Sequence, residues 1–203
     1  ANRIAKRNFL PEGDRFKNAT DLEYAFGEMG IVDLAKHLAT LYIEDISDFI
    51  RRNISPHFEL IRYAESLCVA LPSFDVLKEQ VDASSNLIDG LILKIFKEKV
   101  DEVCPSLVGF SVPFPGNLYG ALICGKWLKE AHPDIKILMG GGYVSTELRS
   151  MSDARLFDYI DYLLFDDGEI SIHRLIQYLK GNVNVQDLVR TTFRNNGQVV
   201  VVD

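Results

Sequence analysis

The chain has 203 residues, of which 47% are apolar and 25% are charged, and its net charge is −7. These proportions are ordinary for a globular protein, and the negative charge argues against nucleic acid as a partner, because phosphate contacts need clustered Lys and Arg. The one basic cluster, residues 3–7, is interpreted as a solvated tail. The longest apolar run, residues 87–96, is broken by Asp89 and Lys94 and does not predict a membrane span. No signal peptide opens the chain, so we expect a cytoplasmic protein with no membrane partner.

The two ends and the cysteines suggest what kind of chain this is. The chain begins with Ala rather than Met and ends directly after the strand-like VVVVD, so we expect a piece of a longer protein. Cys68, Cys104 and Cys124 lie far apart and form neither a CxxC motif nor a tight metal-ligand cluster. We therefore predict buried, reduced thiols and no metal site.

The first half of the chain, residues 1–103, is predicted to be mostly helical, either as a separate region or as part of the same domain as the rest. After an irregular start, apolar residues recur at helical spacing in residues 22–29 and 31–50. A further helix is predicted at residues 57–65. The segment SLCVALPS, residues 66–73, fits either the end of that helix or a short strand.

Two more helices are predicted before the second half begins. Ser73 can cap the first of them, and Ser84 or Ser85 can cap the second. The second helix carries an apolar stripe made of Leu87, Leu91, Ile95 and Val100.

The second half, residues 104–203, alternates apolar strands with helices. Strands are predicted at residues 107–112, 135–139 and 159–165, and each runs into a turn of small or polar residues before a helix. This alternation predicts an α/β fold with a Rossmann-like (flavodoxin-like), mostly parallel sheet flanked by helices. The tail TTFRNNGQVVVV predicts a β-hairpin at the sheet edge, because Asn196-Gly197 suits a tight turn.

The turns that follow the predicted strands are the expected place for a ligand, because parallel sheets bind ligands beyond the carboxyl ends of their strands. These turns are residues 111–117, 140–145 and 166–169. Any small-molecule site is therefore expected to combine residues from these three turns.

The helices after the first two strands have predicted caps and a predicted buried face. Asn117 is the expected cap of the first helix, and Ser145 or Thr146 of the second. The buried stripe of the first helix is predicted to be Leu118, Ala121, Leu122, Gly125 and Leu128.

Three features of the turns bear on chemistry. The glycines at 140–142 either leave room for a ligand or form a tight turn that needs positive φ, and the sequence leaves both interpretations open. Ser111 ends the first strand, but neither a GxSxG motif nor a His–Asp pair accompanies it, so we predict no nucleophile. Asp166, Asp167 and Glu169 are interpreted as a cap that complements the positive end of the next helix, in preference to a carboxylate site. No catalytic residue is predicted.

Taken together, these motifs resemble a known family. GFSVPFPGN, LKEAHPDIKILMGGGYVS and YIDYLLFDDGEISIHRLIQYLKG resemble the N-terminal cobalamin-binding-like domain of radical S-adenosylmethionine (SAM) enzymes, over about residues 98–202. In that family a Ser-x-Leu step and a Gly-Gly pair line the slot for the nucleotide tail of cobalamin. Here Ser111-Val112-Pro113 stands in the place of the first, and 26 residues separate it from Gly140-Gly141.

The resemblance implies a set of cofactor-binding residues around these two motifs. They are Ser111, Val112, Pro113, Phe114, Gly140, Gly141, Gly142, Tyr143, Gly168 and Glu169.

The sequence also departs from the family pattern. The DxHxxG motif that supplies an axial His would fall at about residues 64–69, where the sequence is AESLCV, and Pro113 replaces the usual Leu. Cobalamin would therefore bind without a protein His ligand. The cluster motif CxxxCxxC is missing, so SAM and a [4Fe-4S] cluster are expected only in a downstream radical SAM barrel of the same polypeptide, after Asp203.

Three functions follow as hypotheses. The first is a cobalamin-binding-like N-terminal domain that positions a cofactor or substrate for the iron–sulfur domain of a radical SAM oxidoreductase or transferase. The second is a cofactor-free structural or docking module of the same fold. A flavodoxin-like nucleotide or flavin binder ranks last, because the chain lacks phosphate-loop residues.

Overall fold

The computed structural model describes residues 30–60, 65, 74–83 and 86–203. The chain forms two compact units, residues 1–60 and residues 61–203. The predicted helix at 22–29, the ambiguous segment 66–73, Cys68, and the proposed caps Ser73, Ser84 and Ser85 all lie outside the described residues. No helix in the described part of the chain is long and apolar enough to cross a membrane.

The described part of the first unit is dominated by one helix, α3 (Gly30–Asn53), as the apolar spacing predicts. Arg51 and Arg52 lie in its last turn, where positive charge complements the helix dipole. Residues 57–60, predicted to be helical, instead form turns and irregular chain. Arg51 Nε donates to the carbonyl of Phe58 at 2.8 Å and so holds this segment against the end of α3.

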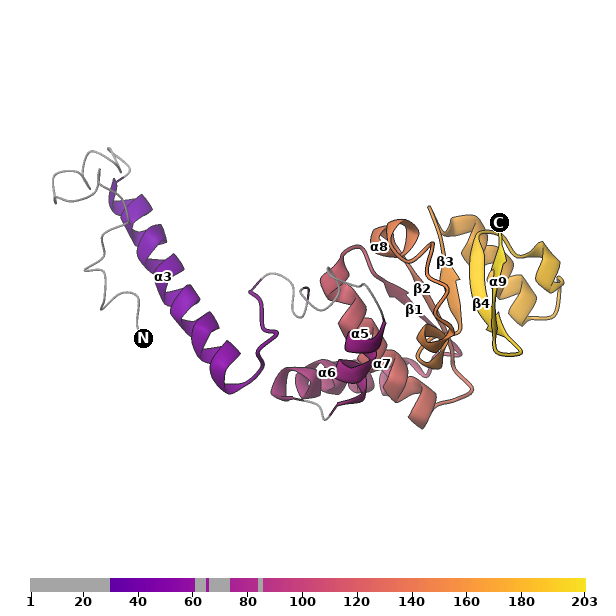
Figure 1. The fold of residues 1–203 in the computed structure, drawn as a ribbon, viewed down its shortest axis with the longest axis horizontal. Coiled ribbons are helices and arrows are strands. Elements are labelled where there is room, and N and C mark those ends of the chain that lie inside the picture. The colour runs from indigo at the N-terminus through magenta and orange to yellow at the C-terminus, as the bar shows by residue number, and fades with distance from the viewer. Residues whose placement is uncertain (1–29, 61–64, 66–73, 84–85) are drawn as a thin grey trace. The chain divides into compact units, whose positions relative to one another are not determined.

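The second unit is built on a five-stranded mixed sheet (Figure 1). The strands lie in chain order across the sheet: β1 (Leu107–Ser111), β2 (Lys136–Gly140), β3 (Tyr162–Leu164), β4 (Thr191–Asn195) and β5 (Gln198–Val202). β1, β2 and β3 pair in parallel, whereas the pairings β3–β4 and β4–β5 are antiparallel. The α/β class is confirmed, but the expected predominance of parallel pairing is not, because β4 runs antiparallel to β3 although a helix connects them, and β5 returns beside β4 in a hairpin. That hairpin is confirmed, with Asn196 and Gly197 at positive φ.

Helices cover both faces of this sheet (Figure 1). They are α5 (Asp75–Asp82), α6 (Leu87–Val103), α7 (Pro115–Ala131), α8 (Gly142–Thr146) and α9 (Glu169–Leu179), with short 3-10 turns η3 (Ala154–Asp158) and η4 (Val185–Asp187). Side chains alternate along a strand. Accordingly Ile137 and Met139 of β2 join the larger core under α5, α6 and α7, while Leu138 joins the smaller core under α9.

Helix α7 is the centre of the larger core. All five residues of its predicted stripe are buried, and Leu118, Leu122 and Leu128 are fully buried. Gly125 permits a close approach to the chain that leads into β3, since a Cβ there would lie 2.4 Å from the carbonyl oxygen of Tyr159. Gly181, with φ of 75°, follows the end of α9 as predicted.

The helix caps differ from the prediction. Asn86 caps α6 in a capping box with Asp89, in place of Ser84 or Ser85. Helix α7 begins at Pro115, whose fixed φ suits a first helical position, so that Asn117 lies inside the helix. Ser145 and Thr146 also lie inside their helix, α8, and do not cap it.

Two predictions of burial are wrong in part. Leu87, Leu91 and Ile95 of α6 are more than half exposed, because the helix turns the opposite side of its surface toward α7. Cys104 is exposed at the end of α6, whereas Cys124 is buried as predicted.

Candidate functional site

A cavity of about 300 Å³ lies at the carboxyl ends of β1, β2 and β3. This is the edge of the sheet at which the sequence predicts a ligand site. The cavity is lined by Gly109, Phe110, Ser111, Leu138, Gly140, Gly141, Leu164, Asp166, Asp167, Gly168 and Ile172.

The structure brings together four of the ten residues expected to bind a cofactor. Ser111, Gly140, Gly141 and Gly168 line the cavity, although they come from three different turns. The other six do not line it. Val112 and Tyr143 are buried in the core, whereas Pro113, Phe114, Gly142 and Glu169 are exposed outside the cavity.

The turns after β1 and β2 are interlocked through their backbones. The Val112 N–H donates to the Gly140 carbonyl at 2.7 Å, and the Tyr143 N–H donates to the Val112 carbonyl at 3.1 Å. Gly141 has φ of 113°, and a Cβ there would lie 2.8 to 2.9 Å from three backbone atoms of Val112. The tight-turn interpretation of the glycine run therefore holds at Gly141, which is also part of the cavity lining.

The third wall is the loop before α9, and its acidic residues do not cap that helix. Gly168 is the N-cap residue, at φ of 77°, and no side chain caps the helix. Asp166 instead pairs with Arg149, and its second oxygen lies 3.4 Å from Arg190 Nε. The capping prediction is therefore wrong for Asp166 and Asp167, whereas Glu169 does lie in the first turn.

Sequence reasoning missed both arginines, because neither belongs to a turn that follows a strand in the parallel part of the sheet. Arg149 comes just after α8, and Arg190 comes just before the antiparallel strand β4. Arg149, in the sequence TELRS, and Arg190, before TTF, follow no residue spacing that would connect them to Asp166.

The lining of the cavity is mostly apolar, with a few polar side chains. Leu138 and Leu164 line it from the face of the sheet that packs against α9, and Ile172 lines it from α9 itself. Gly109 and Gly140 add no side chains over β1 and β2. Ser111 and Asp167, both exposed, are among its polar residues. Such a cavity suits a flat apolar group with a hydrogen-bond donor at its edge. Among the described residues, no three His, Cys, Asp or Glu side chains gather in a way that could hold a metal ion.

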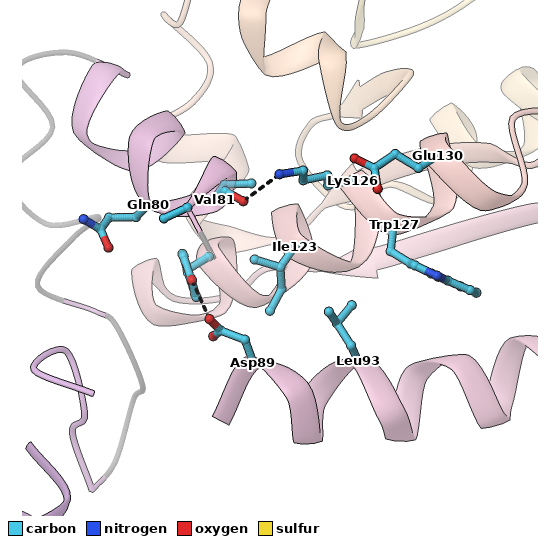
Figure 2. Close-up of a pocket in the computed structure, with 10 residues that line it drawn as sticks. Gln80, Val81, Asp89, Leu93, Ile123, Lys126, Trp127 and Glu130 are labelled. Carbon is cyan, nitrogen blue, oxygen red and sulfur yellow. Dashed lines mark hydrogen bonds between the residues drawn. The ribbon is translucent and has the colours of Figure 1, made fainter. Parts of the chain in front are cut away.

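A second, smaller cavity of about 140 Å³ lies between α5, α6 and α7, away from the strand ends (Figure 2). Two of its polar side chains bind other lining residues. Lys126 Nζ donates to the carbonyl of Val81 at 3.2 Å, and the Tyr119 hydroxyl donates to Asp89 at 3.1 Å. Trp127, another lining residue, packs against Phe96. We interpret this cavity as a packing gap between helices, because it is small and Lys126 and Tyr119 are already hydrogen-bonded within it.

No protein-family model matches the chain, and no curated protein matches it either.

Proposed function

We propose that the chain is a cobalamin-binding-like domain of Rossmann-like fold from a radical SAM enzyme. It holds a cofactor or substrate at the strand ends for an iron–sulfur domain outside these residues, and it carries out no chemistry alone. The observation that supports this proposal is that Ser111, Gly140 and Gly141, which match the motifs of that family, line one cavity.

The residues of the cavity fit the nucleotide tail of cobalamin. An aromatic base could lie against Leu138, Leu164 and Ile172, beside glycine positions that carry no side chain. The Ser111 hydroxyl can donate or accept a hydrogen bond at the edge of that base.

Because the sequence has no DxHxxG motif, cobalamin would bind here without an imidazole ligand from the protein. When bound, cobalamin would supply a cobalt centre for group transfer or electron transfer. The chain itself would bind and orient it and exclude water from its tail.

A specific observation favours a second candidate, a cofactor-free docking module. The backbone of Val112 requires a glycine at position 141, so this glycine has a sufficient reason without any ligand.

The experiment that decides is retention of hydroxocobalamin. The protein, and the full-length protein that contains it, would be mixed anaerobically with hydroxocobalamin and desalted, and the visible spectrum of the protein fraction recorded. We expect about equimolar retention with no histidine-ligated signature. Failure of both proteins to retain the colour would refute cofactor binding and favour the docking module.

A pair of variants locates the site. Ser111→Trp places a large side chain at the cavity and should abolish retention. Ser106→Trp is the matched control, because Ser106 is exposed just before the opposite end of the same strand and does not line the cavity. Equal retention by the two variants would show that cobalamin binds elsewhere.

A further inference from the structure

Asp166 is held by groups from two separate segments of the chain, residues 145–149 and Arg190. Arg149 pairs with one of its carboxylate oxygens, and Arg190 Nε lies 3.4 Å from the other. The Asp166 N–H donates to Ser145 Oγ at 2.8 Å. Arg149 is itself oriented, since its Nε donates to the Ser145 carbonyl at 3.2 Å and its guanidinium lies 5.0 Å from the centre of the Phe165 ring.

The backbone at this cluster needs that support. Asp166 has φ of 60° and Arg190 has φ of 46°, both in the left-handed region that non-glycine residues seldom adopt. Such conformations persist when surrounding contacts stabilise them. The Phe165 N–H donates to the Arg190 carbonyl at 3.0 Å, so the residue before Asp166 is joined to Arg190 through the main chain.

The cluster connects two of the turns that line the cavity. Ser145 belongs to α8, which begins at the glycine turn, whereas Asp166 opens the loop that reaches Gly168. We propose that Arg149 and Arg190 are positioning residues: through Asp166 they hold the 166–168 loop at a fixed place relative to the glycine turn. They thereby make the shape of the cavity, and its affinity for a ligand, sensitive to ionic strength. The part that concerns ligand affinity rests on the proposed function.

Ionic strength can act on this cluster because salt reaches it. The side chains of Arg149, Arg190 and Asp166 are 45%, 50% and 38% exposed. Exposed ion pairs weaken as salt is added, and each contributes little alone. We therefore expect loss of the cluster to open the loop locally, by about fivefold, without unfolding the domain.

The first readout is hydrogen–deuterium exchange of the peptide that contains residues 165–168, measured on the full chain. Arg149→Met should raise exchange of the Phe165 and Asp166 amides about fivefold at low salt. Arg149→Lys should restore part of the protection, because it keeps the charge but loses the planar donor fork. High salt should bring the wild type at least to the level of Arg149→Met, and it should change that variant less, because only the Arg190 contact with Asp166 remains there to be weakened.

Arg155→Met is the matched control. Arg155 also pairs with aspartate, through Asp153 and Asp75, and its guanidinium lies 5.9 Å from the centre of the Phe74 ring, but neither aspartate lines the cavity as Asp166 does. Its loss should leave exchange at residues 165–168 as in the wild type. If the Arg149→Met protein does not fold, hydrogen–deuterium exchange of the wild type at increasing salt concentration still tests whether the ion pairs hold the loop.

The second readout is the affinity for hydroxocobalamin at low and high salt. It should fall in Arg149→Met by about the same factor as exchange rises, and it should stay unchanged in Arg155→Met. Unchanged exchange in Arg149→Met, or in the wild type at high salt, would overturn the role of the cluster. Faster exchange with unchanged affinity would overturn its role in positioning the cavity. If the wild type retains no cobalamin, the proposed function fails, and exchange alone decides whether the arginines hold the loop.

Discussion

Replacing Gly141 with Ala should destabilise the domain strongly, whether or not a ligand binds beside it. The residue has φ of 113° and ψ of 177°, a region that only glycine occupies readily. Adopting it with a side chain costs about 1–3 kcal/mol. The added Cβ would also lie 2.8 to 2.9 Å from the N, C and O atoms of Val112, which are backbone atoms and cannot rotate away.

Overpacking of this kind costs about 1–3 kcal/mol more. The sum is a loss of about 4 kcal/mol, a large share of the roughly 5–15 kcal/mol by which a typical domain is stable. Gly120→Ala is the matched control, because Gly120 lies inside α7 and a Cβ there would meet nothing within 4 Å. Removing a glycine from the middle of a helix should stabilise the protein by about 0.5–1 kcal/mol.

Urea unfolding followed by fluorescence would measure both variants, since Trp127 is the single tryptophan and packs in the larger core of the domain. A loss smaller than about 1 kcal/mol in Gly141→Ala would refute the interlocked turns, because the strain alone should cost that much. Equal losses in the two variants would show that the effect is general to glycine replacement. The same reasoning guides the choice of a variant that blocks the cavity. A side chain at Gly141 would destabilise the fold as well as fill the cavity, so Ser111→Trp is the better variant.

The remaining predictions concern a thiol and a carboxylate. Burial raises the pKa of Cys124 to about 12. Iodoacetamide should therefore label the exposed Cys104 in the native protein and reach Cys124 only after unfolding. Equal labelling rates of the two cysteines, measured by peptide mass spectrometry, would contradict the burial of Cys124. The hydrogen bond from Lys78 lowers the pKa of Asp82 below its ordinary value of 3.8, so Asp82 stabilises the folded state above that pH, and this contribution disappears as the pH falls through the lowered pKa. Urea midpoints measured from neutral pH down to acid should therefore fall less steeply in Asp82→Asn, and parallel curves would be evidence against the pairing.

The strands of the sheet are largely predictable, because each is an apolar run that ends in small or polar residues. β1 and β2 match their predicted ranges to within one residue at each end. β3 is shorter than the predicted 159–165, because Tyr159 and Ile160 are buried beside the sheet without pairing in it. Apolar composition indicates that a segment is buried, whereas the neighbouring strand determines which of its residues pair in the sheet.

Which face of a helix packs is harder to predict. The spacing of Leu87, Leu91 and Ile95 correctly indicates a helix, yet these residues are exposed and Val100 is buried. Periodicity defines a stripe, whereas the contacts with α7 decide the orientation. The same limit explains the caps, since Asn86 and Pro115 compete with other good capping residues only a few positions away.

The cavity follows from the parallel strands, whose carboxyl ends bring Ser111 and Gly140 together. The arginines around Asp166 could not be predicted in this way. They are separated from it by 17 and 24 positions in the sequence, and ion pairs between exposed side chains leave no periodic pattern.

The reversal of direction at β4 gives this cavity a neighbour that a wholly parallel sheet would not have. Thr191, the first residue of β4, lies opposite Leu164, the last residue of β3. β4 therefore starts at the edge of the sheet where the three parallel strands end, and Arg190, the residue just before β4, lies at that edge. A parallel strand in the same position would begin at the opposite edge. The positive charge beside Asp166 is thus a product of topology, and substitutions at the start of the closing hairpin can retune the electrostatics of the cavity while leaving every residue of its glycine turn unchanged.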